Sequence, residues 1–373
     1  MGRKSILVLG GYGGTGRVVC RLLLAETDAN LVVAGRRVAK AEELVGRLNE
    51  EFPSKRVSAL FADASDYESL VSAFQGVSMV LVASTTTEYV KEVAEAALAT
   101  GIDYLDYHYP QSIVPVLNAL APAIEKAGRC FITQAGLHPG LPSVLVRYAA
   151  SSFDRYERAA VSMVMNARVE RSQSLYELVD AIGDYRAEIF RDGEWKEAGY
   201  RDVTRADFGH PFGVRPCYPM QLEEMRALPE MLGLEEVGVY VGGFNWFVDY
   251  VVFPLAMLLF KIKRGLGREF VGDLLAWGIN TFAGARQGVC VVLEAEGEKE
   301  GRPLRLRLMV EHDDPYELTA IPIVASLHQY LDASIAKPGL WMMGHLVDPV
   351  RLMNDMDRMG VRVSTQVTER AGR

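Results

Sequence analysis

The sequence predicts an α/β protein of two domains, a doubly wound parallel sheet at the N-terminus and an α+β domain with a mostly antiparallel sheet after it. A chain of 373 residues is too long for one compact core. In its first third, short apolar runs alternate with amphipathic helical patterns, which is typical of a parallel sheet covered by helices. The first apolar run ends in a glycine-rich turn, as expected where a strand leads into a helix.

Strands and helices alternate strictly in the N-terminal part. Strands are expected at residues 5–9, 31–34, 57–61, 78–83, 102–107 and 129–134. Helices are expected at residues 15–25, 38–52, 66–74, 88–100 and 113–126. Asp66 is expected to cap the third helix, Thr85 has capping-box spacing to Glu88, and Gly101 marks the end of the fourth helix. Continuous apolar strands in this order indicate helices on both faces of the sheet.

The pattern changes after the turn-rich stretch at residues 136–142, which predicts a domain boundary. Residues 1–140 are expected to form the first domain and residues 141–340 the second. Within the second we expect a strand at 159–167, loops over 192–230, a hairpin of 288–295 with 303–311, and a helix at 316–334.

The glycine-rich turn carries the strongest functional signal. Gly10, Gly13 and Gly16 have the spacing G-x-x-G-x-x-G between a strand and a helix. The first glycine permits a sharp turn, the second lets the backbone approach a pyrophosphate, and the third allows close packing of helix on strand. Gly14 and Thr15 lie at the helix N-terminus, whose free N–H groups favour a phosphate. The first domain is therefore predicted to be a Rossmann-type dinucleotide-binding domain.

The end of the second strand predicts which dinucleotide binds. A carboxylate there would accept hydrogen bonds from the ribose of NAD(H), but this chain has Gly35 followed by Arg36 and Arg37. Two guanidinium groups suit a 2′-phosphate, and the glycine leaves room for it. The predicted cofactor is NADP(H).

Other cofactor contacts are expected at the carboxyl ends of further strands, where ligands of such sheets lie. Asp63 follows the third strand and is expected near the adenine. Ala83, Ser84 and Thr85 follow the fourth strand and are expected along the nicotinamide ribose, with helix capping as the alternative role for Thr85.

Candidate proton donors cluster at the ends of the fifth and sixth strands. Tyr107 and His108 follow the fifth strand, and His138 lies in the turn after the sixth. A histidine or tyrosine at this edge could give a proton to a reduced carbonyl or imine, and water is the alternative donor.

Composition and charge exclude several classes of protein. A net charge of −8 argues against a nucleic-acid binder. The four cysteines are far apart in sequence, which indicates buried thiols rather than a zinc site. The cluster of His and Asp at residues 312–314 precedes a proline and a helix, and it resembles an N-cap loop more than a metal site. No secretory signal is recognised, so a cytoplasmic protein is expected.

One long apolar segment stands apart from the rest. Residues 237–260 contain only Asn245 and Asp249 as strongly polar residues, and a basic run follows at Lys261, Lys263, Arg264 and Arg268. The alternatives are a membrane span, a peripheral helix held on anionic lipid over residues 237–268, or a buried core, homodimer face or apolar substrate wall.

Together these features resemble the saccharopine dehydrogenase-like oxidoreductase family. The resemblance rests on the glycine turn and on residues 34–37, 104–106, 136–142 and 337–340. It implies an NADP-binding Rossmann domain plus a mixed α+β domain, with the cofactor between them and residues 341–373 packed back on the first domain. The chain departs from the pattern of that family at His138, where an acidic residue is common.

Two functional hypotheses follow. The first is an NADPH-dependent reductase of an imine, carbonyl or activated alkene, with a small-molecule substrate of apolar or lipid-like character. The second is a non-catalytic NADP(H)-binding protein at a membrane surface.

Overall fold

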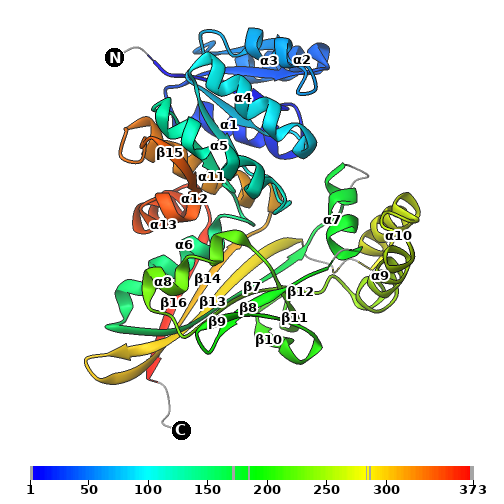
Figure 1. Ribbon diagram of the computed structural model, residues 1–373, viewed down its shortest axis with the longest axis vertical. Coiled ribbons are helices and arrows are strands. Elements are labelled where there is room, and N and C mark those ends of the chain that lie inside the picture. The colour runs from blue at the N-terminus through cyan, green and yellow to red at the C-terminus, as the bar shows by residue number, and fades with distance from the viewer. Residues whose placement is uncertain (1–2, 170–172, 184, 283, 285–286, 370–373) are drawn as a thin grey trace. The chain divides into compact units, whose positions relative to one another are not determined.

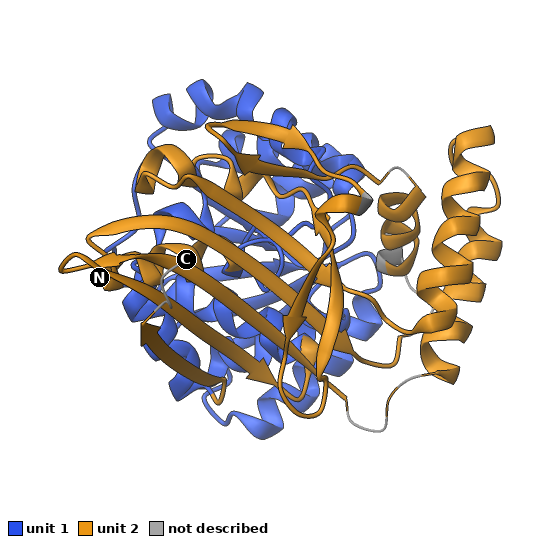
Figure 2. Ribbon diagram, turned by 90° about the horizontal axis from the view of Figure 1, so that it is seen from below, with its two compact units in different colours: residues 1–141, 316–359 blue, residues 142–315, 360–373 orange. Residues whose placement is uncertain are grey.

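The computed structural model divides the chain into two compact units. Met1–Leu141 and Tyr316–Met359 form unit 1, and Pro142–Pro315 with Gly360–Arg373 form unit 2 (Figure 2). The structure describes residues 3–169, 173–183, 185–282, 284 and 287–369. The first boundary lies one residue from the expected position, but residues 316–340, expected in the second domain, belong to unit 1, and residues 360–373 belong to unit 2.

Unit 1 is a seven-stranded parallel sheet in the order β15-β6-β5-β4-β1-β2-β3. Its strands are β1 (Ser5–Leu9), β2 (Asn30–Gly35), β3 (Val57–Phe61), β4 (Met79–Val82), β5 (Asp103–Asp106), β6 (Cys130–Thr133) and β15 (Gly339–Met342). The strand order reverses between β1 and β4, and a parallel α/β sheet binds ligands at the carboxyl ends of the strands beside such a point.

The helices of unit 1 lie on both faces of this sheet (Figure 1). They are α1 (Gly14–Glu26), α2 (Val38–Glu51), α3 (Tyr67–Ala73), η1 (Thr87–Tyr89), α4 (Val90–Thr100), α5 (Ile113–Lys126), α11 (Pro315–Leu331), α12 (Met343–Leu346) and α13 (Pro349–Arg358). Asp66 caps α3 as predicted, because its carboxylate accepts from the backbone N–H groups of Glu68 and Ser69. Gly101 ends α4 with φ +69°.

The predicted role of Thr85 as a helix cap is wrong. The 3₁₀ turn η1 precedes α4, which therefore begins at Val90 with no side-chain cap. The hydroxyl of Ser84 instead hydrogen-bonds that of Thr86 at 2.8 Å, and Thr85 is exposed.

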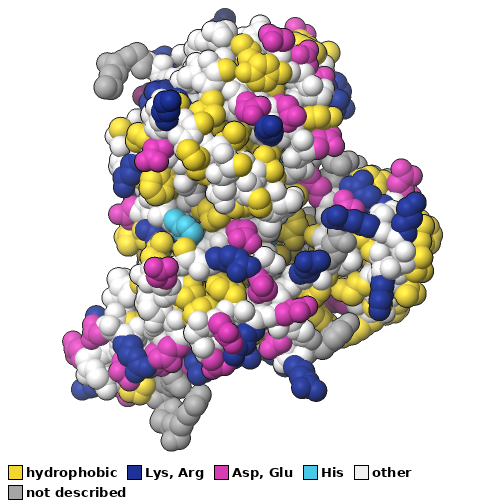
Figure 3. Space-filling model, viewed as in Figure 1, with side chains coloured by type: hydrophobic (Ala, Val, Ile, Leu, Met, Phe, Trp, Pro, Cys, Tyr) yellow, Lys and Arg dark blue, Asp and Glu magenta, His cyan; other side chains and the backbone are white. Residues whose placement is uncertain are grey.

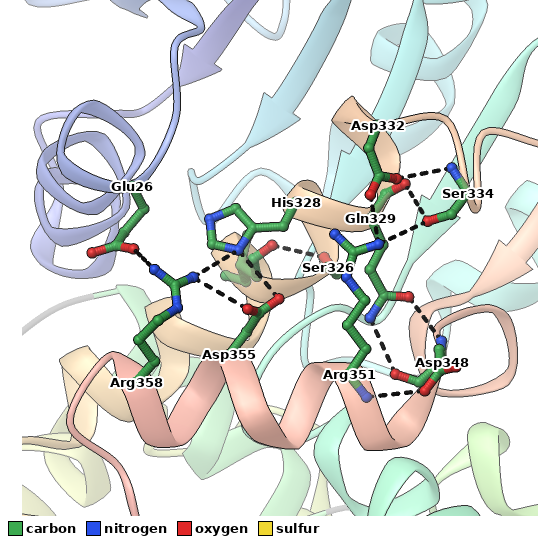
Figure 4. Close-up of polar contacts among 11 residues, drawn as sticks. Glu26, Ser326, His328, Gln329, Asp332, Ser334, Asp348, Arg351, Asp355 and Arg358 are labelled. Atoms are coloured by element: carbon green, nitrogen blue, oxygen red, sulfur yellow. Dashed lines mark hydrogen bonds and ion pairs between the residues drawn. The ribbon is translucent and has the colours of Figure 1, made fainter.

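A network of polar contacts holds α11 and α13 together within unit 1 (Figure 4). Buried Gln329 of α11 donates to the backbone oxygen of Asp348 and accepts from its N–H, at 3.1 and 2.8 Å. Arg358 of α13 pairs with Asp355 and with Glu26 of α1, at 3.2 and 2.7 Å. These contacts, with the pairing of β15 on β6, fix residues 316–359 in unit 1.

Unit 2 is a nine-stranded mixed sheet whose main path runs β10-β11-β12-β7-β13-β14-β16. Its strands are β7 (Arg155–Asn166), β8 (Glu188–Arg191), β9 (Glu194–Glu197), β10 (Thr204–Asp207), β11 (Val214–Met220), β12 (Glu236–Gly242), β13 (Gly288–Lys299), β14 (Arg302–His312) and β16 (Arg362–Glu369). β12 runs parallel to β7, and every other pairing is antiparallel. The predicted fold class is therefore confirmed, and so is the β13–β14 hairpin.

The expectation of loops over residues 192–230 is wrong. Strands β9, β10 and β11 lie there, and short elements connect them: η3 (Tyr200–Asp202), η4 (Glu223–Met225) and α8 (Leu228–Leu232). The strands are short, and Pro216 and Pro219 lie within β11 beside the polar edge strand β10, so the sequence shows little apolar alternation.

The remaining helices of unit 2 are α6 (Leu141–Ala149), the 3₁₀ turn η2 (Ala150–Ser152), α7 (Gln173–Gly183), α9 (Phe253–Ile262) and α10 (Arg268–Thr281). The apolar segment at 237–260 divides into β12, a π-helical turn η5 (Val248–Val252) and α9. In the described part of the chain no helix has the length and apolar character needed to cross a bilayer.

Candidate functional site

The glycine turn packs as closely as its sequence predicts. Gly10 has φ +82°, and a Cβ there would lie 2.7 Å from that of Ser84 at the end of β4. A Cβ on Gly16 would lie 2.6 Å from the backbone oxygen of Gly10, so only glycine allows α1 to approach β1 this closely. Gly13 donates its N–H to Gly10 at 2.9 Å, which closes the turn. The first N–H groups of α1 have no acceptor within the helix and can bind a phosphate.

The two arginines at the end of β2 are exposed and free to bind an anion. In the part of the chain that the structure describes, neither Arg36 nor Arg37 has a carboxylate within ion-pair distance. The guanidinium of Arg37 lies 5.4 Å from the ring centre of Tyr12, and its backbone N–H donates to the Tyr12 hydroxyl at 3.2 Å. A Cβ on Gly35 would lie 2.6 Å from the same hydroxyl.

These residues fit NADP(H). Unpaired guanidinium groups beside a glycine can bind a 2′-phosphate in bidentate fashion. Sequence reasoning missed Tyr12, which lies inside the glycine motif as a variable residue. The one feature of the sequence that could have pointed to Tyr12 is an aromatic residue directly before Gly13.

Asp63 lies on the same side of unit 1 as Arg36. Its carboxylate accepts from the N–H and hydroxyl of Ser65 at 3.0 and 2.8 Å. The backbone hydrogen bond from Ser65 is the main cause that lowers the pKa of Asp63. Burial opposes it, and the Ser65 hydroxyl and the positive charge of Arg36 lower the pKa further. Asp63 is therefore ionised at neutral pH and remains a candidate acceptor for the adenine amino group.

Tyr107 connects three of the predicted site segments. Its hydroxyl donates to the backbone oxygen of Ala83 at 3.2 Å, and it also hydrogen-bonds Thr15 of α1. Burial raises the pKa of Tyr107 well above its usual value, and the Thr15 hydrogen bond opposes this rise only in part. The phenol therefore keeps its proton and positions the backbone after β4.

His108 is buried and has one ring nitrogen without a partner. Its side chain is 6% exposed, and Nε2 has no hydrogen bond. Its backbone N–H donates to Asp106 at 3.1 Å, and Asp106 also accepts from the hydroxyl of Thr133 and the N–H of Gln134. Burial lowers the pKa of His108 despite the opposing charge of Asp106.

The turn after β6 folds back onto the end of β5. The ring of His138 stacks on Tyr109 with 6.3 Å between centres. Gln134 has φ +56°, is fully buried, and donates to the side chain of Gln111 at 2.8 Å. Its Oε1 and the Nε2 of His138 are buried without partners. Sequence reasoning missed Gln134 because an amide at a strand end carries no titratable group.

The structure therefore brings the candidate residues together within unit 1 at the carboxyl ends of β1, β4, β5 and β6. The buried polar atoms without partners in the described residues include three at this edge: His108 Nε2, Gln134 Oε1 and His138 Nε2. Buried polar groups are normally satisfied, so these atoms make this edge of the sheet a candidate binding site. Among the described residues, no three His, Cys, Asp or Glu side chains are grouped so that they could hold a metal ion.

Burial lowers the pKa of His138 from 6.5 to about 4, which predicts acid sensitivity. Between these values the unfolded chain binds the proton and the folded chain does not, so the free energy of unfolding decreases as pH falls through this window. The loss expected from His138 is about 3 kcal/mol. Urea unfolding at pH 7 and pH 4.5 measures it.

His138→Gln should reduce this pH dependence, whereas His210→Gln, at an exposed position, should leave it unchanged. An unaltered pH dependence in His138→Gln would show that this imidazole titrates normally in the folded protein.

The fold of unit 1 and the residues of its glycine turn fit a nicotinamide-nucleotide-dependent oxidoreductase. Residues 6–132 match the family model described as the saccharopine dehydrogenase NADP binding domain. Residues 6–132 thus form an NADP-binding domain of the saccharopine dehydrogenase type, and the predicted cofactor NADP(H) is confirmed.

Two curated relatives and one solved structure are similar to it. Carboxynorspermidine synthase of Vibrio cholerae is 24% identical over 96% of this chain and 95% of its own length. Saccharopine dehydrogenase [NADP(+), L-glutamate-forming] of Saccharomyces cerevisiae is 31% identical over 42% of this chain and 32% of its own length. The apo structure of the Saccharomyces cerevisiae saccharopine dehydrogenase (L-Glu forming) superimposes with a TM-score of 0.72, at 16% identity over 98% of this chain and 100% of that one. This last match shows a shared fold.

Proposed function

We propose that this protein reduces a carbon–nitrogen double bond, an imine formed from an amine and a carbonyl compound, with NADPH. The observation that carries this proposal is the protonation state of the three candidate donors. Burial keeps His108 and His138 neutral at pH 7 and keeps the proton on Tyr107. Burial therefore moves the pKa of each of the three groups away from 7, the value that suits a general acid, downward for the histidines and upward for Tyr107.

The protonation states distinguish the possible substrates. A carbonyl oxygen that receives a hydride becomes an alkoxide and needs an acid beside it. An imine is far more basic and takes its proton from water before it binds. The iminium carbon then accepts the hydride, the nitrogen keeps its proton, and a secondary amine leaves with no further proton from the protein.

The residues of the chain have binding and positioning roles in this scheme. The bound nicotinamide supplies the hydride. The amide oxygen of Gln134 can only accept a hydrogen bond, and the unpartnered Nε2 of a neutral histidine can accept one in one of its two tautomers. An iminium or amine N–H is a matching donor. The glycine turn and the N-terminus of α1 would hold the pyrophosphate of the dinucleotide.

The curated relative over most of the chain is called a carboxynorspermidine synthase, a name that describes joining of an amine to a carboxyl-bearing unit. This supports an imine rather than an alkene or an isolated ketone as the bond reduced. The test is NADPH oxidation followed by absorbance, with panels of amines and of aldehydes or keto acids. Oxidation that needs both partners supports the proposal, and oxidation with a carbonyl compound alone contradicts it.

Substitution of the unpartnered groups should separate binding from chemistry. We expect His138→Ala and Gln134→Leu each to raise the KM for the imine about tenfold or more, since each removes about 1–3 kcal/mol of hydrogen bonding. Tyr107→Phe should reduce kcat by less than tenfold, because the phenol positions backbone and donates no proton.

The pH profile gives an independent check on the same residues. The rate should fall above the pKa of the free imine, with no dependence on a protein acid near pH 7. If His108→Ala or His138→Ala abolished turnover and removed a pKa near 7 from the profile, a histidine would be the acid. Binding of NADPH without turnover on any substrate would favour the non-catalytic alternative.

A further inference from the structure

The helices α9 and α10 expose an unusual amount of apolar surface. Eight of the large hydrophobic side chains that are exposed in unit 2 belong to residues 246–277. They are Trp246, Tyr250, Val251, Leu258, Ile262, Leu266, Phe270 and Trp277, with exposed fractions between 39% and 69%. Soluble monomers rarely expose large contiguous apolar patches unless the patch binds something. We call these eight residues the α9–α10 surface.

This surface is separate from the core of its own helices. Val252, Ala256 and Phe260 face inward from η5 and α9 and pack with Leu275 and Ile279 of α10. The exposed residues therefore do not result from incomplete packing, because the helices already bury one apolar side. An ordinary surface helix has a polar side opposite its buried one, and α9 has Leu258 and Ile262 there instead.

Aromatic rings form one end of the α9–α10 surface. Trp246 and Trp277 pack in a cluster with Phe247 and Phe282, with ring centres 5.2 to 5.7 Å apart. Yet Trp246 and Trp277 remain 59% and 53% exposed. Tryptophan at this combination of order and exposure is typical of side chains that lie at a lipid–water boundary.

Basic side chains border the same surface. Lys261, Lys263 and Arg264 follow one another at the end of α9 and are exposed, and in the described part of the chain neither lysine has an ion-pair partner. The chain as a whole has a net charge of −8, so this cluster opposes its general charge. Basic and apolar side chains lie together on this helical part of unit 2 in the space-filling view (Figure 3).

We infer that the α9–α10 surface docks on an anionic phospholipid bilayer. The ten residues of α9 extend about 15 Å, half of a bilayer core, so the helix lies in the plane of the interface. The apolar side chains enter the acyl boundary, and the three cations contact lipid phosphates. A second copy of the chain is a less suitable partner. A two-fold contact would place this surface of one copy, with its lysines, against the same surface of the other, and the cores of protein interfaces contain few lysines.

Vesicle flotation tests the inference with the full chain and NADPH present. We expect the protein to float with vesicles of phosphatidylcholine and phosphatidylglycerol. The variant Leu258→Ser/Ile262→Ser/Phe270→Ser should float at least tenfold less, and Lys261→Glu/Lys263→Glu should lose its response to the anionic lipid. Raising salt should weaken binding of the wild type in the same way.

Matched variants keep the test interpretable. Met231→Ser and Val350→Ser remove exposed apolar side chains elsewhere, and Lys126→Glu reverses an exposed charge elsewhere, so these should float as the wild type does. Binding of NADPH, followed by nicotinamide fluorescence, reports whether each variant is folded. Wild type that stays with the soluble fraction overturns the inference, and so does a triple variant that floats unchanged. A wild-type dimer that the triple variant breaks, without flotation, assigns the surface to a second copy.

Discussion

Replacing Arg36 and Arg37 together with glutamate should weaken NADPH binding by at least a hundredfold while NADH binding changes far less. Both guanidinium groups are exposed and lack carboxylate partners in the described part of the chain, so their hydrogen-bonding capacity is available to a ligand. Charge-assisted hydrogen bonds contribute about 1.5–3 kcal/mol each, and two of them correspond to roughly a hundredfold or more in Kd. Glutamate also adds repulsion against a phosphate.

The measurement is a fluorescence titration with each nucleotide. Arg47→Glu is the matched control, because Arg47 lies further along α2 and pairs with Glu43 at 3.8 Å, away from the end of β2. That variant should bind NADPH as the wild type does. Equal losses for NADPH and NADH in the double variant would mean that the arginines support the fold or the pyrophosphate rather than the 2′-phosphate.

Gly16→Ala should abolish nucleotide binding and destabilise the protein by about 2 kcal/mol or more. Helix propensity alone predicts the opposite, since alanine is favoured over glycine inside a helix by about 1 kcal/mol. The new methyl group would lie 2.6 Å from the oxygen of Gly10 and 2.9 Å from the Cα of Gly11. Both are backbone atoms, so α1 must move away from β1 and its N–H groups must leave the phosphate position.

Gly46→Ala gives the matched control for this substitution. Gly46 lies within α2, and a Cβ there meets nothing within 4 Å. It should raise the free energy of unfolding by about 0.5–1 kcal/mol and leave NADPH binding unchanged. Urea unfolding and the nucleotide titration measure both variants. If Gly16→Ala were as harmless as Gly46→Ala, the close approach of helix and strand would not be needed for binding.

The sequence predicted those parts of the fold that local pattern determines. The strands from β1 to β6 and their helices have strong periodicity, and their ends agree with the structure to within about two residues in most cases. The strand β15 was not predicted, because its four residues are only partly buried and show no alternation. It forms by pairing with β6 some 200 residues earlier in the chain, which no local signal reports.

The same distinction, between features that a local pattern determines and features that appear only in the folded chain, applies to the site. The glycines and arginines could be predicted because a phosphate imposes strict requirements on backbone and charge. Gln134 could not, because its importance depends on burial and on a positive φ that appear only when the turn after β6 is folded. Tyr107 was predicted as a proton donor, and we propose a positioning role for it from its hydrogen bond to the backbone oxygen of Ala83, which the sequence does not reveal.

The division of the chain between the two units has a consequence for its synthesis. Unit 1 lacks β15, α12 and α13 until residue 359 has been made, and unit 2 lacks its last strand until residue 369 has been made. An N-terminal fragment of 141 residues emerging from the ribosome therefore exposes the unpaired edge of β6. Exposed sheet edges pair readily with other strands. During translation this edge should stay open to other strands until β15 (Gly339–Met342) has been made, and truncation before β15 should yield aggregates rather than a smaller nucleotide-binding protein.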